Sequence, residues 1–381
     1  MEGYFDNAAT SYKKPAGMYE FIADYMKQYG ANIGRGTYES SKRGSDVLSE
    51  TRNKLLAVMN ASSTKTAIIT PSATVALNII LYGFKLTKGD VVYISHFEHN
   101  AILRPLYDLE KSFEIVIKFL PMATEDKFSF DLKATELAFL NDKPKAVIVS
   151  QVSNVLGTIA PVEEIALLAK KFNAVTVVDG AQSCSVIDCD LTNIDFFVFA
   201  GHKTLLGPTG IGGFICNKNT NLYSFIKGGT GIDSANREMP KSVPERFEAG
   251  TMNLMAVVGL NYSLDWILKN KNYIQDTEQK NLDTLFKILK KYDFLQIISP
   301  YPRISSIISC CARGYTSDEF GMILSEHGIA VRTGLHCAPE AHKYANSFPE
   351  GLIRFSVNCF TKQEDFEILD MVLMSFAAEG L

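Results

Sequence analysis

Short apolar runs alternate with stretches of helical periodicity over the first two thirds of the chain. β-branched apolar segments predict strands at 67–70, 90–95, 145–151, 174–179 and 195–199, and the spacing between them predicts helices at 74–83 and 161–171. Strands that are apolar almost throughout are typical of a parallel sheet covered by helices on both faces. The pattern therefore predicts an α/β fold whose main sheet is mostly parallel.

The last third of the chain has a different pattern. Helices are expected at about 253–269, 277–291, 317–327 and 362–376, and strands at about 304–310, 329–332 and 352–357. We interpret this part as a smaller α/β domain, because 381 residues exceed what one core usually serves, about 250–300 residues. The predicted division is an N-terminal segment (1–15), a large domain (16–255) and a small C-terminal domain (256–381), with the boundary near Thr251 to Gly259.

Composition and charge narrow the class of protein. Hydrophobic residues make up 46% and charged residues 21% of the chain, as in ordinary globular proteins. A formal net charge of −4 gives no electrostatic reason to expect nucleic acid or an anionic membrane as a partner. The start of the chain lacks the basic and apolar regions of a secretory signal, and no apolar run is long enough to span a membrane.

The cysteines indicate the compartment. There are seven, an odd number in a long chain, and none forms a Cys-x-x-Cys pair. This usage argues against a disulfide framework and against a structural zinc site. We therefore expect a reducing, cytoplasmic location, with most of the cysteines serving as small buried residues.

A lysine and an aspartate mark the ends of two buried strands. Lys203 follows the strand at 195–199, and Asp179 ends the strand at 174–179. Burial would lower the pKa of the lysine, which suits an amine that forms a Schiff base, although a lysine entering solvent at a strand end is the simpler alternative. An acid at the carboxyl end of a parallel strand suits the pyridine nitrogen of pyridoxal 5'-phosphate (PLP), although the aspartate could instead cap a helix.

A phosphate site is expected where a strand leads into a helix. The stretch Thr70 to Thr74 offers backbone N–H groups at a helix start, where anions bind, although it could be an ordinary capped helix. The glycine-rich stretch Gly207 to Gly213 matches neither Walker A nor GxGxxG. We assign it no nucleotide role.

The order of short motifs resembles a known family. From Tyr4 to about Phe360 the chain contains YFDNAAT, EHNA, SNVLGT, DGAQ, GHK followed by GPTGIGG, RFEAGT and RTGLHCA. In this order they resemble the cysteine desulfurase branch of the class V aminotransferase family. The resemblance implies a fold-type I, PLP-dependent transferase, normally a homodimer with its active sites at the interface. It also places the N-terminal segment near the active site.

The resemblance assigns roles residue by residue. Lys203 matches the Schiff-base lysine, Asp179 the partner of the pyridine nitrogen, and Gln182 the residue that bonds the phenolate oxygen. His99 matches the catalytic histidine stacked on the ring, although a histidine with satisfied hydrogen bonds in the core is an alternative. The matches to phosphate contacts are Ala73, Thr74, His202 and, reaching in from the other subunit, Thr251.

Two departures from the family pattern concern the phosphate site. Ala200 and Ala73 stand where the family often has hydroxyl residues, although a backbone N–H can still serve at Ala73. An extra residue also lies between Lys203 and Gly207. These departures indicate a divergent subgroup and put the physiological substrate in question more than the cofactor.

Cys337 is the candidate nucleophile. It lies in a loop before an expected helix, and Arg332 and His336 could favour its thiolate. A structural cysteine is one alternative, and a metal site of His336, Cys337 and His342 is another, but no fourth ligand is evident, so we assign no metal. In the family the matching cysteine takes sulfur from the substrate L-cysteine as a persulfide, and alanine leaves.

The expected substrate site combines three polar residues. Arg354 matches the residue that binds the substrate carboxylate, Asn154 matches a residue near both cofactor and substrate, and Arg332 is placed with them. Arg354 could instead be a surface arginine on an edge strand. The short stretch between Cys337 and Arg354 resembles the group II desulfurases, the branch that includes selenocysteine lyases, and favours a dedicated sulfur-acceptor protein.

Three other functions remain open at this point. The protein could be a selenocysteine lyase, or another class V aminotransferase or lyase in which Cys337 is incidental. It could also be a non-catalytic binding protein that keeps the fold. Whether Cys337 faces the cofactor site distinguishes the desulfurase from the enzymes in which this cysteine has no role.

Overall fold

The computed structural model describes residues 3–33, 36–302 and 305–378, and this part of the chain contains three sheets. The largest has seven strands in the order β2-β8-β7-β6-β5-β3-β4. They are β2 (Lys65–Thr70), β3 (Val91–Ile94), β4 (Val116–Phe119), β5 (Ala146–Ser150), β6 (Val175–Asp179), β7 (Phe196–Ala200) and β8 (Gly212–Asn217). Strand β8 runs antiparallel to both of its neighbours, β2 and β7, and the other four strand pairs are parallel, which confirms the prediction of a mostly parallel sheet.

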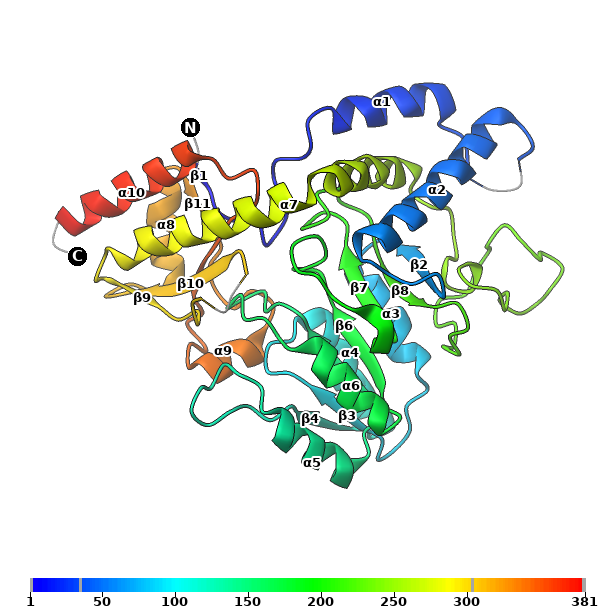
Figure 1. Ribbon diagram of the computed structural model, residues 1–381, viewed down its shortest axis with the longest axis horizontal. Coiled ribbons are helices and arrows are strands. Elements are labelled where there is room, and N and C mark those ends of the chain that lie inside the picture. The colour runs from blue at the N-terminus through cyan, green and yellow to red at the C-terminus, as the bar shows by residue number, and fades with distance from the viewer. Residues whose placement is uncertain (1–2, 34–35, 303–304, 379–381) are drawn as a thin grey trace.

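Helices cover both faces of this sheet because its strands are apolar on both sides (Figure 1). On β5, Ala146 and Ile148 join the core beneath α3 (Ala73–Gly83) and α4 (Asn100–Phe113). Val147 and Val149 point the other way, into the core beneath the remaining helices. Those helices are α2 (Glu39–Val58), α5 (Leu132–Asp142), α6 (Val162–Lys171) and the first half of α7 (Leu254–Lys290), with α1 (Met18–Tyr29) outside them.

The C-terminal part forms a second layer around an antiparallel sheet. Its strands are β9 (Leu295–Ile297), β10 (Ile307–Ala312) and β12 (Ile353–Ser356), in the order β12-β10-β9. The second half of α7, α8 (Ser317–Glu326) and α10 (Gln363–Ala378) pack on this sheet. The start of the chain also belongs to this C-terminal part, since β1 (Gly3–Tyr4) pairs in parallel with β11 (Ile329–Ala330) in a separate two-stranded sheet. The remaining elements are α9 (Pro339–Ala345) and two 3₁₀ turns, η1 (Leu191–Asn193) and η2 (Glu245–Phe247).

Three expectations need correction or qualification. The helices expected at 253–269 and 277–291 are one helix, α7, which bends at Asn270, where φ and ψ are not helical. The connecting residues continue the helical pattern and bury Ile274, so no loop forms. The strand expected at 329–332 extends only over Ile329–Ala330. The strand expected to begin at Ile304 starts at Ile307, and Ile304 itself lies outside the described residues.

No helix in the described ranges combines the length and the apolar character that a membrane span needs.

Candidate active site

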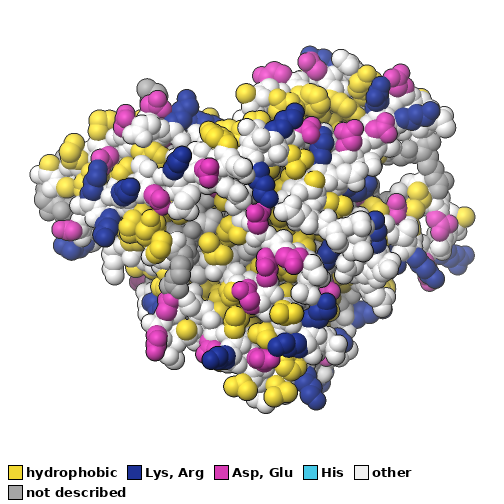
Figure 2. Space-filling view, viewed as in Figure 1, with side chains coloured by type: hydrophobic (Ala, Val, Ile, Leu, Met, Phe, Trp, Pro, Cys, Tyr) yellow, Lys and Arg dark blue, Asp and Glu magenta, His cyan; other side chains and the backbone are white. Residues whose placement is uncertain are grey.

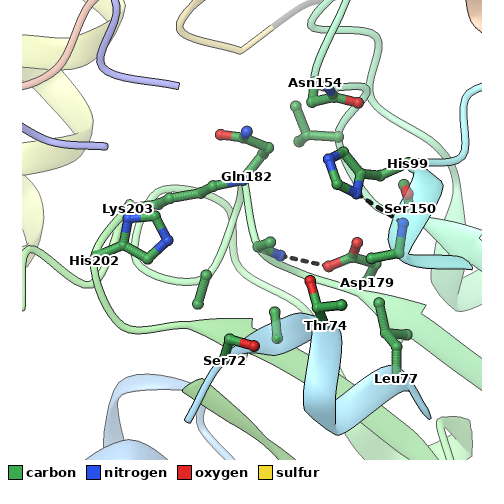
Figure 3. A pocket seen from close by; sticks show the side chains of 15 residues that line it. Ser72, Thr74, Leu77, His99, Ser150, Asn154, Asp179, Gln182, His202 and Lys203 are labelled. Carbon is green, nitrogen blue, oxygen red and sulfur yellow. Dashed lines mark hydrogen bonds between the residues drawn. The ribbon is translucent and has the colours of Figure 1, made fainter. Parts of the chain in front are cut away.

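The site lies where four neighbouring parallel strands end. Lys203 follows β7, Asp179 ends β6, Asn154 follows β5 and His99 follows β3. Parallel strands end at the same edge of a sheet, which is where α/β proteins place ligands. Figure 3 shows these side chains converging on one pocket, with Ser72 and Thr74 from the start of α3 at its lower end. The lining consists of Ser72, Ala73, Thr74, Leu77, His99, Ala101, Ser150, Val152, Asn154, Asp179, Ala181, Gln182, Ala200, His202 and Lys203.

Lys203 has the electrostatic surroundings of a reactive amine. Burial lowers the pKa of Lys203 to about 8, against the opposing effect of Asp179 and with a further contribution from Arg354. An amine with this pKa is partly neutral near physiological pH, and the neutral amine is the nucleophile that a carbonyl group requires.

Asp179 is the only carboxylate in the lining of this pocket. It is buried, and its Oδ1 accepts a hydrogen bond from the N–H of Ala181 (3.0 Å). Burial raises the pKa of Asp179, while the Ala181 N–H and Lys203 act to lower it. A carboxylate with one backbone donor keeps capacity for a cationic partner in the pocket.

His99 is held as a neutral ring. It is the N-cap residue of α4, and its Nδ1 accepts a hydrogen bond from the N–H of Ala101 (3.0 Å). Burial, with a further contribution from nearby Lys203, lowers the pKa of His99 to about 4. An Nδ1 that accepts leaves the proton on Nε2. The ring therefore offers a flat neutral face and one N–H donor.

The start of α3 provides an anion site. The side chain of Ser72 accepts from the N–H of Val75 (3.2 Å), whereas the first N–H groups of a helix, here at Ala73 and Thr74, have no partner within it. Strand β8 approaches closely at Gly212, where a Cβ would lie 2.5 Å from the nitrogen of Ala73. Only glycine fits there, and its small size allows the start of α3 to pack directly against strand β8.

Two further predicted contacts lie at the pocket, and one does not. His202 lines it, and its buried Nδ1 has no hydrogen-bond partner among the described residues. Gln182 also lines it and donates through Nε2 to the carbonyl of Ala8 (2.9 Å), in the N-terminal segment. Thr251 lies outside the pocket and is exposed, just before α7. Its role in the site of a second subunit stays a prediction.

These residues fit PLP. An amine of lowered pKa, a buried carboxylate, a neutral histidine ring and a helix start correspond to its aldehyde, pyridine nitrogen, ring face and phosphate. The unpartnered Nδ1 of His202 provides one more hydrogen-bonding atom on the pocket wall.

Cys337 sits at the tip of a tight turn. The N–H of Ala338 donates to the carbonyl of Leu335 (2.9 Å), and the central residues His336 and Cys337 both have positive φ, 48° and 57°. Positive φ at both positions is typical of a type I′ turn, and it costs a residue other than glycine about 1–2 kcal/mol. Surrounding contacts must hold such a turn in place.

Two hydrogen bonds hold the centre of this turn. The side chain of Asn154 donates to the carbonyl of His336 (2.7 Å), and the N–H of Asn100 donates to the carbonyl of Cys337 (2.6 Å). The exposed Cys337 lies on the wall of a groove that shares Thr74, His99 and Ala101 with the cofactor pocket. The groove that contains the thiol therefore adjoins the pocket that contains Lys203.

Arg354 is buried on β12 with part of its guanidinium unused. Nη1 donates to the carbonyl of Asn154 (2.9 Å), and Nη2 donates to Oδ1 of Asp6 (2.7 Å). Nε is buried and has no partner within the described chain. An unsatisfied donor on a buried guanidinium is a place for a carboxylate. Arg332 pairs with Arg354 through backbone hydrogen bonds, but its side chain is exposed, and neither arginine is among the residues that line the pocket or the groove.

Two carboxyl groups near the site escaped the sequence analysis. Asp6 forms the ion pair with Arg354, and the motif YFDNAAT contained it without assigning it a role. Glu98 is fully buried beside His99 and accepts from Ser95 and from both the N–H (3.0 Å) and the hydroxyl (2.7 Å) of Ser150. Burial raises the pKa of Glu98 to about 7, against the effect of these donors. Its place directly before His99 was the available signal.

The histidines of the considered metal site contact one another. His336 Nδ1 and His342 Nε2 are 3.3 Å apart. Within the described ranges, no group of three or more His, Cys, Asp or Glu side chains could hold a metal ion.

A strand-end lysine and aspartate on a seven-stranded α/β sheet, with a helix start for phosphate, define a fold-type I PLP enzyme. The chain belongs to the class V aminotransferase family, because the family model "Aminotransferase class-V" matches residues 3–369. Members of this family are PLP-dependent, which confirms the predicted cofactor.

Relatives that match the chain over most of its length are named as cysteine desulfurases or probable cysteine desulfurases. A "Cysteine desulfurase" of Synechococcus elongatus is 32% identical over 88% of this chain, and the match spans 54% of that longer protein. A "Probable cysteine desulfurase" of Methanothermobacter thermautotrophicus is 30% identical, with 99% of this chain and 95% of the relative covered. The apo structure of cysteine desulfurase from Thermococcus onnurineus NA1 aligns with a TM-score of 0.88 at 28% identity, covering 100% of this chain and 95% of that one. These likenesses confirm the predicted fold.

Proposed function

We propose that the protein is a PLP-dependent cysteine desulfurase that converts L-cysteine to L-alanine and keeps the sulfur as a persulfide on Cys337. The observation that carries this proposal is the position of the thiol, on a groove that shares His99 and Thr74 with the pocket of Lys203 and Asp179. An aminotransferase would have no use for an exposed thiol there. The matching relatives, named cysteine desulfurases, support the same assignment.

The side chains of this chain have separable tasks. Bound PLP supplies an electron sink that weakens bonds at the α and β carbons of the substrate. Asp179 would hold the pyridine nitrogen and favour its protonated form. The ring of His99 would cover the bound cofactor and exclude water from it. Lys203 would hold the cofactor, and its amine would move protons at the α carbon of the substrate. Arg354 binds the substrate carboxylate through its free Nε and a neighbouring N–H.

The sulfur transfer balances without an added oxidant. The Cys337 thiolate attacks the sulfur of the substrate, a sulfur–sulfur bond forms and the carbon–sulfur bond breaks. The electron pair of the broken bond stays with the carbon skeleton, which takes up a proton and leaves as alanine. L-cysteine and a thiol thus become alanine and a persulfide.

The test is to supply L-cysteine to the purified, PLP-loaded protein. We expect alanine, a Cys337 peptide heavier by one sulfur atom, and sulfide once a reductant is added. Borohydride reduction followed by peptide mass spectrometry should find the cofactor on Lys203, and Lys203→Ala should lack this linkage. Alanine production without sulfur on Cys337 would contradict the role of this cysteine.

We extend the proposal to the acceptor. The persulfide passes to a sulfur-acceptor protein that docks at the groove of Cys337, whose openness to solvent at the thiol supports this transfer. Selenocysteine is the second candidate substrate, since its chemistry places the same demands on Lys203 and Arg354. All seven cysteines are free thiols, which supports a cytoplasmic location.

We also propose a homodimer, in which Thr251 of each chain contacts the phosphate bound by its partner. Thr251 is exposed, and α1 presents Tyr19 and Phe21 with 60% and 41% of their surface accessible. Figure 2 shows the hydrophobic patch over α1. Sedimentation should give a dimer that Phe21→Glu weakens, and a purely monomeric, active protein would refute this arrangement.

We propose the domain division at 15/16 and 255/256, and the second boundary lies at the start of α7.

A further inference from the structure

Two buried histidines lie directly behind the turn that carries Cys337. His336 belongs to the turn, and His342 comes from α9, the short helix that follows it. Their side chains are 4% and 0% exposed, and their rings stack with centroids 5.4 Å apart and planes 14° from parallel. Neither histidine touches the cofactor pocket or the groove. The proposed chemistry gives them no task.

A chain of hydrogen bonds fixes the proton positions on both rings. His336 Nε2 lies 3.2 Å from the carbonyl of Arg332, which can only accept, so Nε2 carries the proton. In a neutral ring this leaves His336 Nδ1 as an acceptor for the His342 Nε2–H at 3.3 Å. His342 Nδ1 is then the acceptor for the hydroxyl of Ser347 at 2.9 Å. One arrangement of protons satisfies all three contacts.

The surroundings favour this neutral arrangement. Burial is the main cause that lowers the pKa of His336 well below its ordinary value, and Arg354 and Arg332 add to it. Burial also lowers the pKa of His342 to about 4, although the Leu335 carbonyl acts in the opposite direction. A proton added to Nδ1 of His336 would place two donors face to face, because His342 Nε2–H already points at that nitrogen.

The position of His342 is itself fixed by packing. Ala338, Ala341 and Ala345 of the α9 segment join a buried cluster with Phe97 and Val155, which belong to loops of the large sheet. The imidazole of His342 is thus anchored to the large sheet. Because the ring of His342 contacts the ring of His336, this packing also restrains the turn to which His336 belongs.

We propose that His342 is a positioning residue for Cys337. Its Nε2–H holds the ring of His336, and the ring of His336 holds the turn in the positive-φ conformation that presents the thiol to the cofactor pocket. The inference rests on the proposed function in taking Cys337 as the sulfur acceptor. The side chain of Asn154 and the backbone N–H of Asn100 fix the two carbonyls of the turn, and the histidine pair fixes its side-chain face.

Two variants separate the hydrogen bond from the bulk of the side chain. His342→Gln keeps an N–H donor near the place of Nε2, whereas His342→Met keeps a buried side chain of similar length without a donor. His327→Met is the matched control, because His327 is exposed and, among the described residues, its ring forms a hydrogen bond only with the carbonyl of Ile323. All three are prepared as PLP-loaded enzymes.

The first readout is the rate of alanine formation. Misplacement of a reacting group by about 1 Å can cost roughly 100-fold. We expect His342→Met to lower kcat by about 10- to 100-fold with KM for cysteine little changed, since Arg354 is untouched. His342→Gln should recover most of the loss, and His327→Met should match the wild type.

The second readout does not depend on activity. Hydrogen exchange of the peptide covering 331–341 should be faster in His342→Met than in wild type and close to wild type in His342→Gln. The chain has six histidines, few enough for ¹⁵N-histidine spectra to assign the tautomers. Both His336 and His342 should carry their proton on Nε2.

The outcomes separate the two proposals. Wild-type behaviour of His342→Met, or equal losses in the Met and Gln variants, would overturn the positioning role. A His336 ring protonated on Nδ1 would do the same, and this measurement needs only the wild-type protein. A wild type that forms no alanine but shows the expected tautomers and exchange rates would instead refute the proposed function and leave the histidine contact standing.

Discussion

Replacing Arg354 with lysine tests the substrate site most directly. The guanidinium already donates two hydrogen bonds inside the protein, from Nη1 to the carbonyl of Asn154 and from Nη2 to Asp6. In the proposed site the substrate carboxylate would therefore depend on Nε, which has no partner among the described residues, and on a remaining N–H beside it. Lysine keeps the positive charge but has a single nitrogen, so it cannot serve the protein contacts and a bidentate carboxylate together.

The structure sets the size of the effect. Losing one charge-assisted hydrogen bond to the carboxylate costs about 1.5–3 kcal/mol, which corresponds to a rise of about 10- to 100-fold in the cysteine concentration at half-maximal rate. Giving up a protein contact as well should lower the free energy of unfolding by about 1–3 kcal/mol. The first effect appears in kinetics and the second in stability.

The assay is alanine release over a series of cysteine concentrations, with urea unfolding of the same preparations. Arg313→Lys is the matched control, because Arg313 is exposed and its side chain, within the described part of the chain, donates only to the carbonyl of Asp293 (3.2 Å). A folded Arg354→Lys enzyme with an unchanged Michaelis constant would show that the substrate carboxylate binds elsewhere. Loss of stability alone would assign Arg354 a structural role with Asp6.

Three further substitutions test other parts of the site. Asp179→Ala should lose most activity even when saturated with cofactor, because an unprotonated pyridine is a poor electron sink, and near-normal turnover would remove this role. Cys337→Ser should nearly abolish alanine release from cysteine but leave substantial release from selenocysteine, because selenium can leave the carbon without attack by a thiolate more readily than sulfur can. Equal losses on the two substrates would mean that Cys337 does more than accept sulfur. Glu278 is buried and accepts from Ser306, and burial raises its pKa from the ordinary 4.5 to about 7. Below pH 4.5 the carboxyl is protonated in the folded and the unfolded state, and the stability that this protonation provides is lost as the pH rises through 7. Between pH 5 and pH 8 the free energy of unfolding of Glu278→Gln should therefore rise by up to about 3 kcal/mol relative to that of the wild type. A difference between the two proteins in urea unfolding that stays constant over this range would contradict the assignment.

The sequence predicted the part of the site that a parallel sheet organises. Lys203, Asp179 and His99 each follow an apolar run, and the carboxyl ends of parallel strands share one edge. Their convergence in one pocket therefore follows from the order of strands and turns. Thr74 belongs to the same class, because a helix start after a strand can be read from local residues.

Other elements lacked a local signal. Strand β8 begins with Gly212 and Gly213, which favour a loop by composition. The structure requires the second glycine, since a Cβ there would lie 1.9 Å from the carbonyl oxygen of Ile68 on the antiparallel neighbour β2. The same holds for α7, where a polar stretch around Asn270 suggested a loop but Ile274 stays buried in a continuous helix.

The contacts that set the geometry of the reaction join residues far apart in sequence. Asp6 holds Arg354, Arg354 holds the carbonyl of Asn154, and the side chain of Asn154 holds the carbonyl of His336. Each partner taken alone is a common polar residue, and no periodicity connects them. The same hydrogen-bonded path that orients the expected carboxylate-binding group thus ends at the turn of Cys337. Asn154 is fixed at the edge of the large sheet. In the proposed reaction, this one rigid element would therefore position both the substrate carboxylate and the attacking sulfur. A substitution of Asp6 should accordingly shift the Cys337 thiol as well as the side chain of Arg354.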